Sequence, residues 1–247
     1  MDRMIHTALS GMEAAMTRQR VTASNLANAQ TTGFRAETFT VDPAQLKGPA
    51  LEARAMNRGS VHGADMRSGA MVETGNALDI AIGGNALLAL QGADGSEVYS
   101  RRGDLSVGAS GVLQNGDGRP VMGQAGPITI PPGRNLSIGQ DGTISARDPA
   151  APDAPAEELG RIKLASMEGS RIAKDTDGFM RVVGGGILPT DQAATLTSGA
   201  LEQSNVDTTQ VLVDMIEAQR SFERRAKLFS TANEIDTSGA RLMSLRS

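Results

Sequence analysis

The sequence predicts an α+β protein, in which long N- and C-terminal helices form a coiled-coil-like helical domain and the centre forms an all-β, barrel- or sandwich-like domain. One observation is the distribution of turn-forming residues. All ten Pro residues lie between Pro43 and Pro189, together with all but four of the 29 Gly residues. This pattern marks a turn-rich middle between two uninterrupted ends. A second observation is that apolar residues in both ends recur at alternating steps of four and three, as in a helix that packs lengthwise on another helix.

Residues 2–29 predict the first helix, within an N-terminal segment of residues 1–34. Its apolar stripe is expected to form an intrachain seam and consists of Ile5, Leu9, Met12, Met16 and Leu26. The helix is expected to stop at Asn28–Gly33, with Gly33 at a positive φ that other residues disfavour. Phe34 is expected to hold the exit of the chain to the helical layer. Gly33→Val is therefore expected to impair assembly while leaving the melting of the β domain unchanged.

The middle of the sequence divides into two parts. Residues 35–77 show no sustained period and predict an extended connector. Residues 78–189 contain short apolar runs separated by Gly, Asn, Asp or Pro. Strands this short and this evenly spaced predict an all-β barrel or sandwich that folds without the termini.

Residues 190–247 predict a linker followed by the longest helix, over about residues 206–245. At about 1.5 Å per residue this helix would be about 60 Å long, which is more than one small core can cover. Its main stripe is the expected partner of the N-terminal seam and contains Leu212, Met215, Phe222 and Phe229. A second apolar set is expected to contact neighbouring subunits, because a helix with two apolar edges needs more than one neighbour: Val213, Ile216, Ile235 and Leu242. An intrachain helical hairpin in a monomeric protein is the alternative interpretation of the seams.

Composition argues against several classes of function. The formal net charge of −4 provides no general basic field for nucleic acid. No apolar run approaches the roughly 18 residues of a membrane span, so no membrane insertion is expected. The N-terminus has no basic region followed by an apolar core, so no cleaved signal peptide is expected. The chain has no Cys, and thus no disulfide or Cys-based metal site.

No group of residues predicts a catalytic or metal site, and no cofactor is expected. His6 and His62 are the only histidines, and both are interpreted as solvated side chains. Asp175 and Asp177, followed by Gly178, are similar to part of a calcium loop. However, Ala173 and Gly184 occupy the first and twelfth positions, where oxygen ligands are required. We therefore expect a tight turn here, and no enzyme.

Four segments carry a resemblance to a known family. Residues 23–35 resemble the N-terminal signature of bacterial flagellar rod and hook proteins, through Asn25, Leu26, Asn28, Thr32, Gly33 and Phe34. Residues 78–82 and 99–105 resemble the entry into the family's β domain and its Tyr-Thr-Arg-x-Gly segment. Residues 199–206 resemble the signature that opens the C-terminal helix, through Gly199, Leu201, Glu202, Ser204, Asn205 and Val206.

The resemblance implies a structural axial subunit of the flagellar basal-body rod that transmits torque through its terminal helices. It implies other rod proteins and copies of the same chain as partners, together with the flagellar type III export apparatus. The implied location is the periplasmic rod, reached without a cleaved signal. Length and the residues from Val21 to Glu37 favour a proximal-rod member, with a distal-rod member as the alternative. A ligand-binding β domain with helical arms and an assembly cap are the competing classes.

Overall fold

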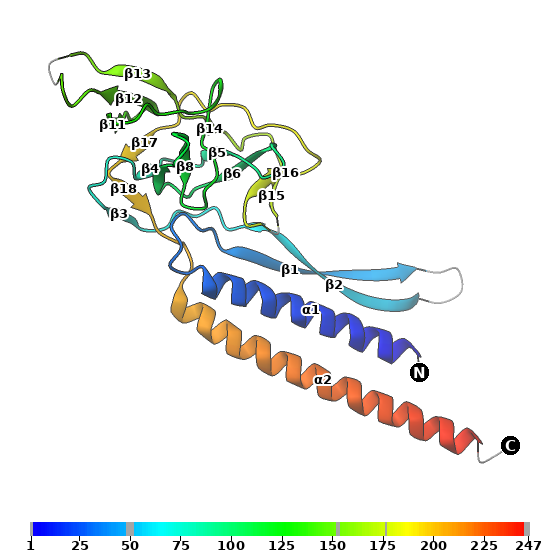
Figure 1. The fold of residues 1–247 in the computed structure, drawn as a ribbon. Coiled ribbons are helices and arrows are strands. Elements are labelled where there is room, and N and C mark those ends of the chain that lie inside the picture. Colours follow the sequence, from blue (N-terminus) through cyan, green and yellow to red (C-terminus); the bar gives the residue numbers. More distant parts are fainter. Residues whose placement is uncertain (1, 48–51, 152–153, 176, 245–247) are drawn as a thin grey trace. The chain divides into compact units, whose positions relative to one another are not determined.

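Two helices flank a β-rich middle in the computed structural model, which describes residues 2–47, 52–151, 154–175 and 177–244 (Figure 1). Helix α1 spans Asp2–Ala27 and helix α2 spans Thr208–Ser244. The predicted α+β class, with a helix at each end and strands between, is confirmed. The chain forms two compact units. The helical unit comprises Met1–Ala27, Glu37–Gly63 and Asp207–Ser247, and the β unit comprises Asn28–Ala36 and Ala64–Val206.

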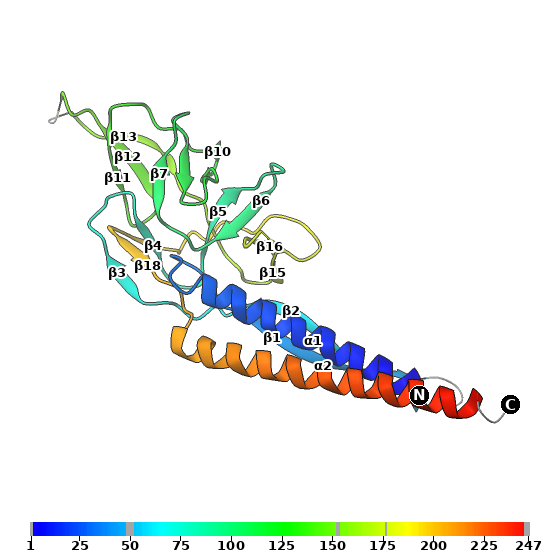
Figure 2. The same ribbon diagram turned by 60° about the horizontal axis from the view of Figure 1, so that its bottom comes forward.

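In the helical unit, α1 and α2 pack side by side in antiparallel directions (Figure 2). Arg18 lies 3.9 Å from Glu217, and Gly11 lies against the guanidinium of Arg225. Residue numbers thus rise along one helix as they fall along the other. Helix α2 begins where Asp207 caps it, since the Asp207 carboxylate accepts hydrogen bonds from two backbone N–H groups of the first turn at 2.9 and 3.1 Å.

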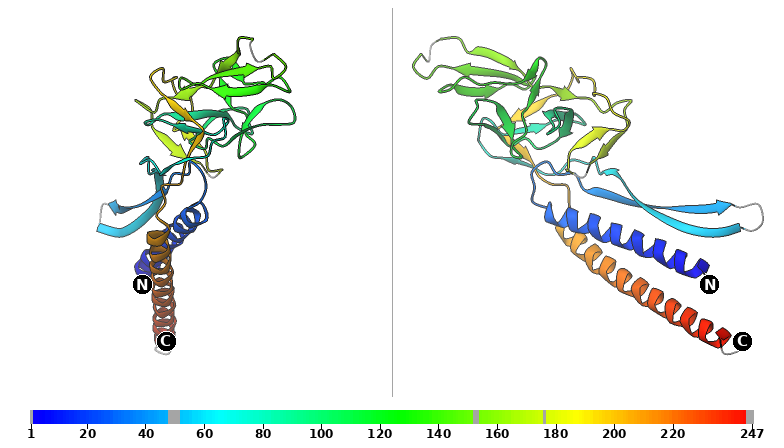
Figure 3. Two further views of the ribbon diagram at one scale, coloured as in Figure 1. Left: turned by 90° about the vertical axis from the view of Figure 1, so that its left-hand side faces the viewer. Right: turned by 45° about the vertical axis from the view of Figure 1, so that its right-hand side comes forward.

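Two long strands complete the helical unit, where the sequence predicted an extended connector. Strands β1 (Glu37–Lys47) and β2 (Glu52–Ala64) form a two-stranded sheet that runs along α1 (Figure 3). Asn25 near the end of α1 fixes the start of β1. Its side chain donates to Glu37 O at 3.0 Å and accepts from Glu37 N at 2.8 Å. Helix α1 therefore contacts both α2 and β1.

The β unit consists of several small sheets. The largest has the order β14-β5-β6-β16-β15, with neighbouring strands antiparallel: β14 (Leu164–Ala165), β5 (Leu87–Gln91), β6 (Glu97–Ser100), β16 (Met180–Val182) and β15 (Ile172–Lys174). A three-stranded antiparallel sheet contains β11 (Asn135–Ile138), β12 (Thr143–Arg147) and β13 (Glu157–Arg161).

Four antiparallel strand pairs make up the remainder: β3 (Met71–Glu73) with β18 (Ala200–Glu202), β4 (Ile80–Ile82) with β17 (Leu196–Ser198), β7 (Leu105–Val107) with β8 (Leu113–Asn115), and β9 (Met122–Gly123) with β10 (Gly126–Pro127). The predicted barrel is not present among the described strands. The largest sheet starts at β14 and ends at β15 without closing, because strands of two to five residues are grouped into separate sheets.

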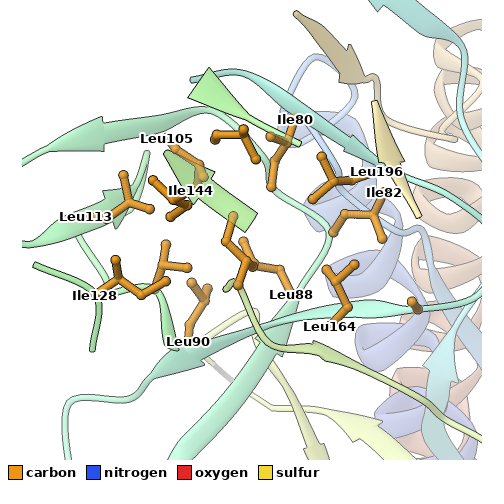
Figure 4. Close-up of a cluster of buried hydrophobic side chains, with 14 of the residues drawn as sticks. Ile80, Ile82, Leu88, Leu90, Leu105, Leu113, Ile128, Ile144, Leu164 and Leu196 are labelled. Carbon is orange, nitrogen blue, oxygen red and sulfur yellow. The ribbon is translucent and has the colours of Figure 1, made fainter. Parts of the chain in front are cut away.

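The main hydrophobic cluster of the β unit gathers side chains from β4, β5, β7, β8, β12, β14 and β17 (Figure 4). Leu88 and Leu90 of β5 point into this cluster, while Leu87 and Ala89 join a second cluster with Tyr99 and Met180. Both faces of β5 are therefore buried, which explains why its sequence is a continuous apolar run rather than an alternation.

The β unit extends beyond the predicted span of residues 78–189 at both ends. Strand β17 pairs with β4, and Leu196 of β17 is buried in the main cluster. Strand β18 pairs with β3 in the same way. The sheet pairing and part of the core thus depend on residues that the sequence assigned to the connector and the final linker.

Candidate functional site

The face of α2 that packs within the helical unit contains most of the predicted seam. Ala218 is buried, and Met215, Phe222 and Phe229 are half-buried. Leu212 is 48% exposed, whereas the preceding residue, Val211, is half-buried and belongs to the packed stripe. The stripe therefore follows the predicted spacing but starts one residue earlier.

The face of α1 that is buried carries mostly small side chains rather than the predicted large ones. The buried positions are Ser10, Gly11, Ala14, Ala15, Val21, Thr22 and Asn25. Met12 and Leu26 are half-buried, whereas Leu9 and Met16 are exposed. Small residues let a neighbouring element approach closely, as at Gly11, where Arg225 lies in the space that a Cβ would occupy. Leu9 and Met16, two of the bulkier residues of the expected seam, are thereby left on the surface of the helical unit.

The second apolar set of α2 lies on the surface of the helical unit. Val213, Ile216 and Ile235 are 47%, 52% and 56% exposed, and Leu228 is also exposed. Because Gly11 lies beside Arg225, the first residue of α1 falls opposite about residue 234, and the rest of α2 extends past α1 (Figure 2). The side chains of Ile5, His6, His62 and Leu242 lie outside the described residues.

In the β unit, the N-terminal signature, the 99–105 segment and the C-terminal signature meet at a buried ionic junction, formed by Arg35, Arg101 and Glu202. The Glu202 carboxylate lies 2.7 Å from Arg35 Nη2 through one oxygen and 2.7 Å from Arg101 Nε and Nη2 through the other. All three side chains are at most 2% exposed. Two buried cations thus share one buried anion.

The two arginines of the junction have different surroundings. Arg101 also donates to the carbonyls of Ile82, Gly84 and Ala86, so its guanidinium closes the turn after β4. Arg35 Nη1 donates to Arg67 O. Its Nη2 approaches Glu202 at ion-pair distance but without hydrogen-bond alignment. Burial lowers the pKa of Arg35, and the nearby positive charge of Arg101 lowers it further, while Glu202 raises it.

Two glycines bring the backbone close to the junction. Gly33 has a φ of 65°, as predicted, and its N–H donates to Glu202 O at 2.7 Å. A Cβ at Gly33 would lie 2.5 Å from Arg102 N and closer still to the Arg101 carbonyl. Gly69 N donates to Glu202 Oε1 at 2.9 Å, and a Cβ there would collide with Gln203 O. Only glycine fits these approaches without a shift of backbone.

Asn205 of the C-terminal signature connects three segments. Its side chain accepts from Ala36 N and donates to Asp65 O and Arg67 O, each at 2.8 Å. Its backbone N–H donates to Phe34 O at 3.3 Å. The amide therefore ties the end of segment 28–36 to the start of the β unit's second segment.

Phe34 contacts a side chain of the β unit. Lys174 Nζ lies 3.5 Å from the centre of the Phe34 ring and donates to Arg35 O at 3.2 Å. This is a cation–π contact, and it fixes segment 28–36 against β15. That Phe34 holds the exit of the chain to the helical layer stays a prediction.

The other signature residues shape the turns at either end. Asn28 accepts from Thr31 through both its backbone and its side-chain oxygen, which closes the turn after α1, and Thr32 lies half-buried beside it. Gly199 has a φ of 79° between β17 and β18, and Leu201 pairs with Val72 in β18 and β3. The Ser204 hydroxyl accepts from Val206 N at 3.3 Å just before α2.

Arg35 and Arg101 lie within segments that resemble the family, but the sequence alone gave no reason to assign a role to either residue. No sequence pattern predicted the contact of Gly69 with Glu202 or that of Lys174 with Phe34. The positions of the junction are far apart in the chain, and only the fold brings them together.

In the loop that is similar to part of a calcium site, the guanidinium of Arg181 binds the acidic side chains. Arg181 donates to Asp175 at 3.0 Å and to both Asp177 oxygens at 2.8 and 2.7 Å. Arg102 bridges Asp104 and Asp117 similarly. Over the described residues, no cluster of three or more His, Asp or Glu side chains could hold a metal ion. Neither described helix has the length and apolar character needed to cross a bilayer.

Three family models match the chain. "Flagella basal body rod protein" matches residues 5–35, "Flagellar hook protein FlgE/F/G D1 domain" matches residues 81–146, and "Flagellar basal body rod FlgEFG protein C-terminal" matches residues 197–242. The first and third models contain the two signatures that meet at the ionic junction. The class of protein that the fold and these matches define is a flagellar axial structural protein.

The chain is similar over nearly its full length to curated rod proteins. It is 38% identical to the flagellar basal-body rod protein FlgF of Salmonella typhimurium, over 99% of this chain and 100% of the relative. It is 39% identical to FlgF of Escherichia coli, over 95% of each. It is 30% identical to the rod protein FlgG of Bacillus subtilis, over 94% of this chain and 96% of the relative. The chain therefore belongs to the flagellar basal-body rod protein family, and it is a structural subunit of the rod.

Proposed function

We propose that the chain is a proximal-rod subunit of the FlgF type that polymerises through the exposed apolar faces of α1 and α2 and transmits torque from motor to hook. The greater identity to the two FlgF relatives than to the FlgG relative supports this type. A distal-rod subunit of the FlgG type is the alternative. Other rod proteins and copies of the chain are the proposed partners, and its proposed route is flagellar type III export without a cleaved signal to the periplasmic rod.

The observation that carries the proposal is the exposed apolar surface of α2. Val213 and Ile216 lie on the exposed side of α2, near its start, and Ile235 lies where α2 extends past α1. Isolated apolar side chains are common on protein surfaces, but a set that follows one long helix indicates an interaction face. Contacts that repeat from subunit to subunit without closing a ring build a helical filament.

The face of α1 supplies the second part of the proposed contact. Leu9 and Met16 are exposed while the small residues beside them are buried. Long helices that pack on neighbours through coiled-coil-like stripes resist shear because packed interiors are stiff. We propose that Leu9, Met16 and Leu212 pack against neighbouring subunits, while Met215, Phe222 and Phe229 form the intrachain seam.

The test is Ile216→Asp in cells that lack the native gene. A charge buried without a partner costs several kcal/mol, and every subunit of a polymer repeats this cost. We expect loss of motility and incomplete rods in isolated basal bodies, while the circular dichroism of the purified monomer is unchanged. Gln219→Asp, which adds the same charge at an exposed polar position of α2, is the control and should leave swimming intact. Normal motility with complete rods in Ile216→Asp cells would refute this contact.

A further inference from the structure

The ionic junction contains two positive charges and one negative charge, and the residue with the negative charge is the last of the three in the sequence. Arg35 belongs to segment 28–36, Arg101 follows β6, and Glu202 ends β18. All three side chains are buried. Without Glu202, two buried guanidinium groups would face each other with no buried anion between them.

The other charged groups near the junction do not replace Glu202. Asp65 lies close enough to influence Arg35, but its carboxylate is already bound by Arg67 at 2.6 to 3.1 Å. Arg101 has three carbonyl acceptors, which stabilise a cation only through dipoles. A buried charge that loses its counter-ion is strongly destabilised.

The contacts that dock segment 28–36 come largely from the residues around Glu202. Gly33 N donates to Glu202 O at 2.7 Å, and Ala36 N donates to the Asn205 side chain at 2.8 Å. The Arg35 guanidinium pairs with the Glu202 carboxylate. The docking of a segment near the N-terminus is thus built on residues close to the C-terminal helix.

We propose that Glu202 is a conditional counter-charge, which lets segment 28–36 dock on the β unit only after strand β18 is in place. A chain is synthesised from its N-terminus, so Arg35 and Arg101 exist before Glu202 does. Until β18 pairs with β3, repulsion between the arginines and their desolvation keep segment 28–36 undocked.

The experiment is amide hydrogen exchange on the purified full-length chain carrying Glu202→Gln. Gln keeps the shape of Glu and an oxygen that can accept from Gly69 N, and removes only the charge. We expect exchange at Gly33 and Ala36 to accelerate by about a hundredfold or more. The amides of Leu113 and Val121, which are bonded within the core, should keep their protection.

A second variant separates charge from shape. In the double variant Arg35→Met with Glu202→Gln, the two arginines no longer repel each other and the net charge of the junction is again that of the native chain. Replacement of buried ions by apolar groups of similar volume is often tolerated. We expect exchange at Gly33 to slow by at least about tenfold relative to Glu202→Gln alone. Glu97→Gln is the matched control, because Glu97 pairs with Lys163 at 2.7 Å elsewhere in the same unit. It should leave Gly33 unaffected.

Three results would overturn the proposal. The first is an amide exchange rate at Gly33 in Glu202→Gln that stays within about threefold of the rate in the native chain, because the loss of a buried counter-ion should cost much more than that. The second is a double variant that exchanges as fast as the single one, which would show that charge balance is not the cause. The third is parallel loss of protection at Leu113 and Val121, which would show that segment 28–36 does not dock as a separate step.

Discussion

Replacing Gly33 by Ala should destabilise the β unit by much more than an ordinary turn glycine would. At a φ of 65°, a residue with a Cβ carries a penalty of about 1–2 kcal/mol. The added Cβ would also lie 2.5 Å from Arg102 N, so the segment must move by about 1 Å to reach normal van der Waals separation. That movement breaks the Gly33–Glu202 hydrogen bond, worth about 0.5–1.5 kcal/mol, and overpacking adds about 1–3 kcal/mol. The expected loss is about 3–6 kcal/mol in the free energy of unfolding.

Gly118→Ala is the matched control for backbone strain alone. Gly118 has a φ of 73°, and no atom lies within 4 Å of the position of a Cβ, so the expected loss is about 1–2 kcal/mol. Tyr99 is the only Tyr in a chain without Trp and is buried in the β unit. Its fluorescence during urea unfolding of the full-length protein therefore reports on this unit. Equal losses for the two variants would refute the claim that close packing against Arg101 adds to the cost of a side chain at Gly33.

Two pH-dependent predictions follow from other groups in the β unit. Burial raises the pKa of Tyr99 above its ordinary 10.0, so the stability that neutral Tyr99 contributes is complete below pH 10.0 and is lost as the pH rises further. Tyrosinate absorbance should therefore appear together with unfolding in an alkaline titration. Tyrosinate absorbance of the folded protein near pH 10 would contradict the burial of Tyr99. The hydrogen bond from Arg181 lowers the pKa of Asp177 below its ordinary 3.8, so this contribution is present above that pH and is lost as the pH falls. Asp177→Asn should lower the free energy of unfolding at pH 7 by less than about 1 kcal/mol, because the pair of Arg181 and Asp177 is partly exposed. At pH 2 the substitution should have little effect on urea unfolding. An equal loss at both pH values would show that the ion pair is not responsible.

The helices could be predicted from the sequence because a sustained spacing of apolar residues is a local signal. The contact face of α1 could not, since small residues such as Ala14 and Ala15 are buried while Met16 is exposed. A spacing of apolar residues gives the period of a helix, but the volume of each side chain decides how closely another helix approaches.

Strands β1 and β2 escaped prediction because residues 37–63 lack the apolar alternation of a half-buried strand. The ionic junction escaped it for a different reason. Arg35, Arg101 and Glu202 are separated by long stretches of sequence, and each is individually typical of a surface position. Gly33 was the exception, since its place in a helix stop predicted its positive φ, although not the backbone of Arg101 that lies against it.

Arg102 and Arg181 supply the positive charge at the acidic turns of the β unit from within the chain, so this charge does not depend on the concentration of any ion in solution. A free divalent ion would occupy such a turn only to the extent that its concentration outside allowed. Arg181 is joined to the same chain as Asp175 and Asp177, so its effective concentration at the turn is set by the fold. These turns can therefore keep their shape whatever the concentration of divalent ions around the protein.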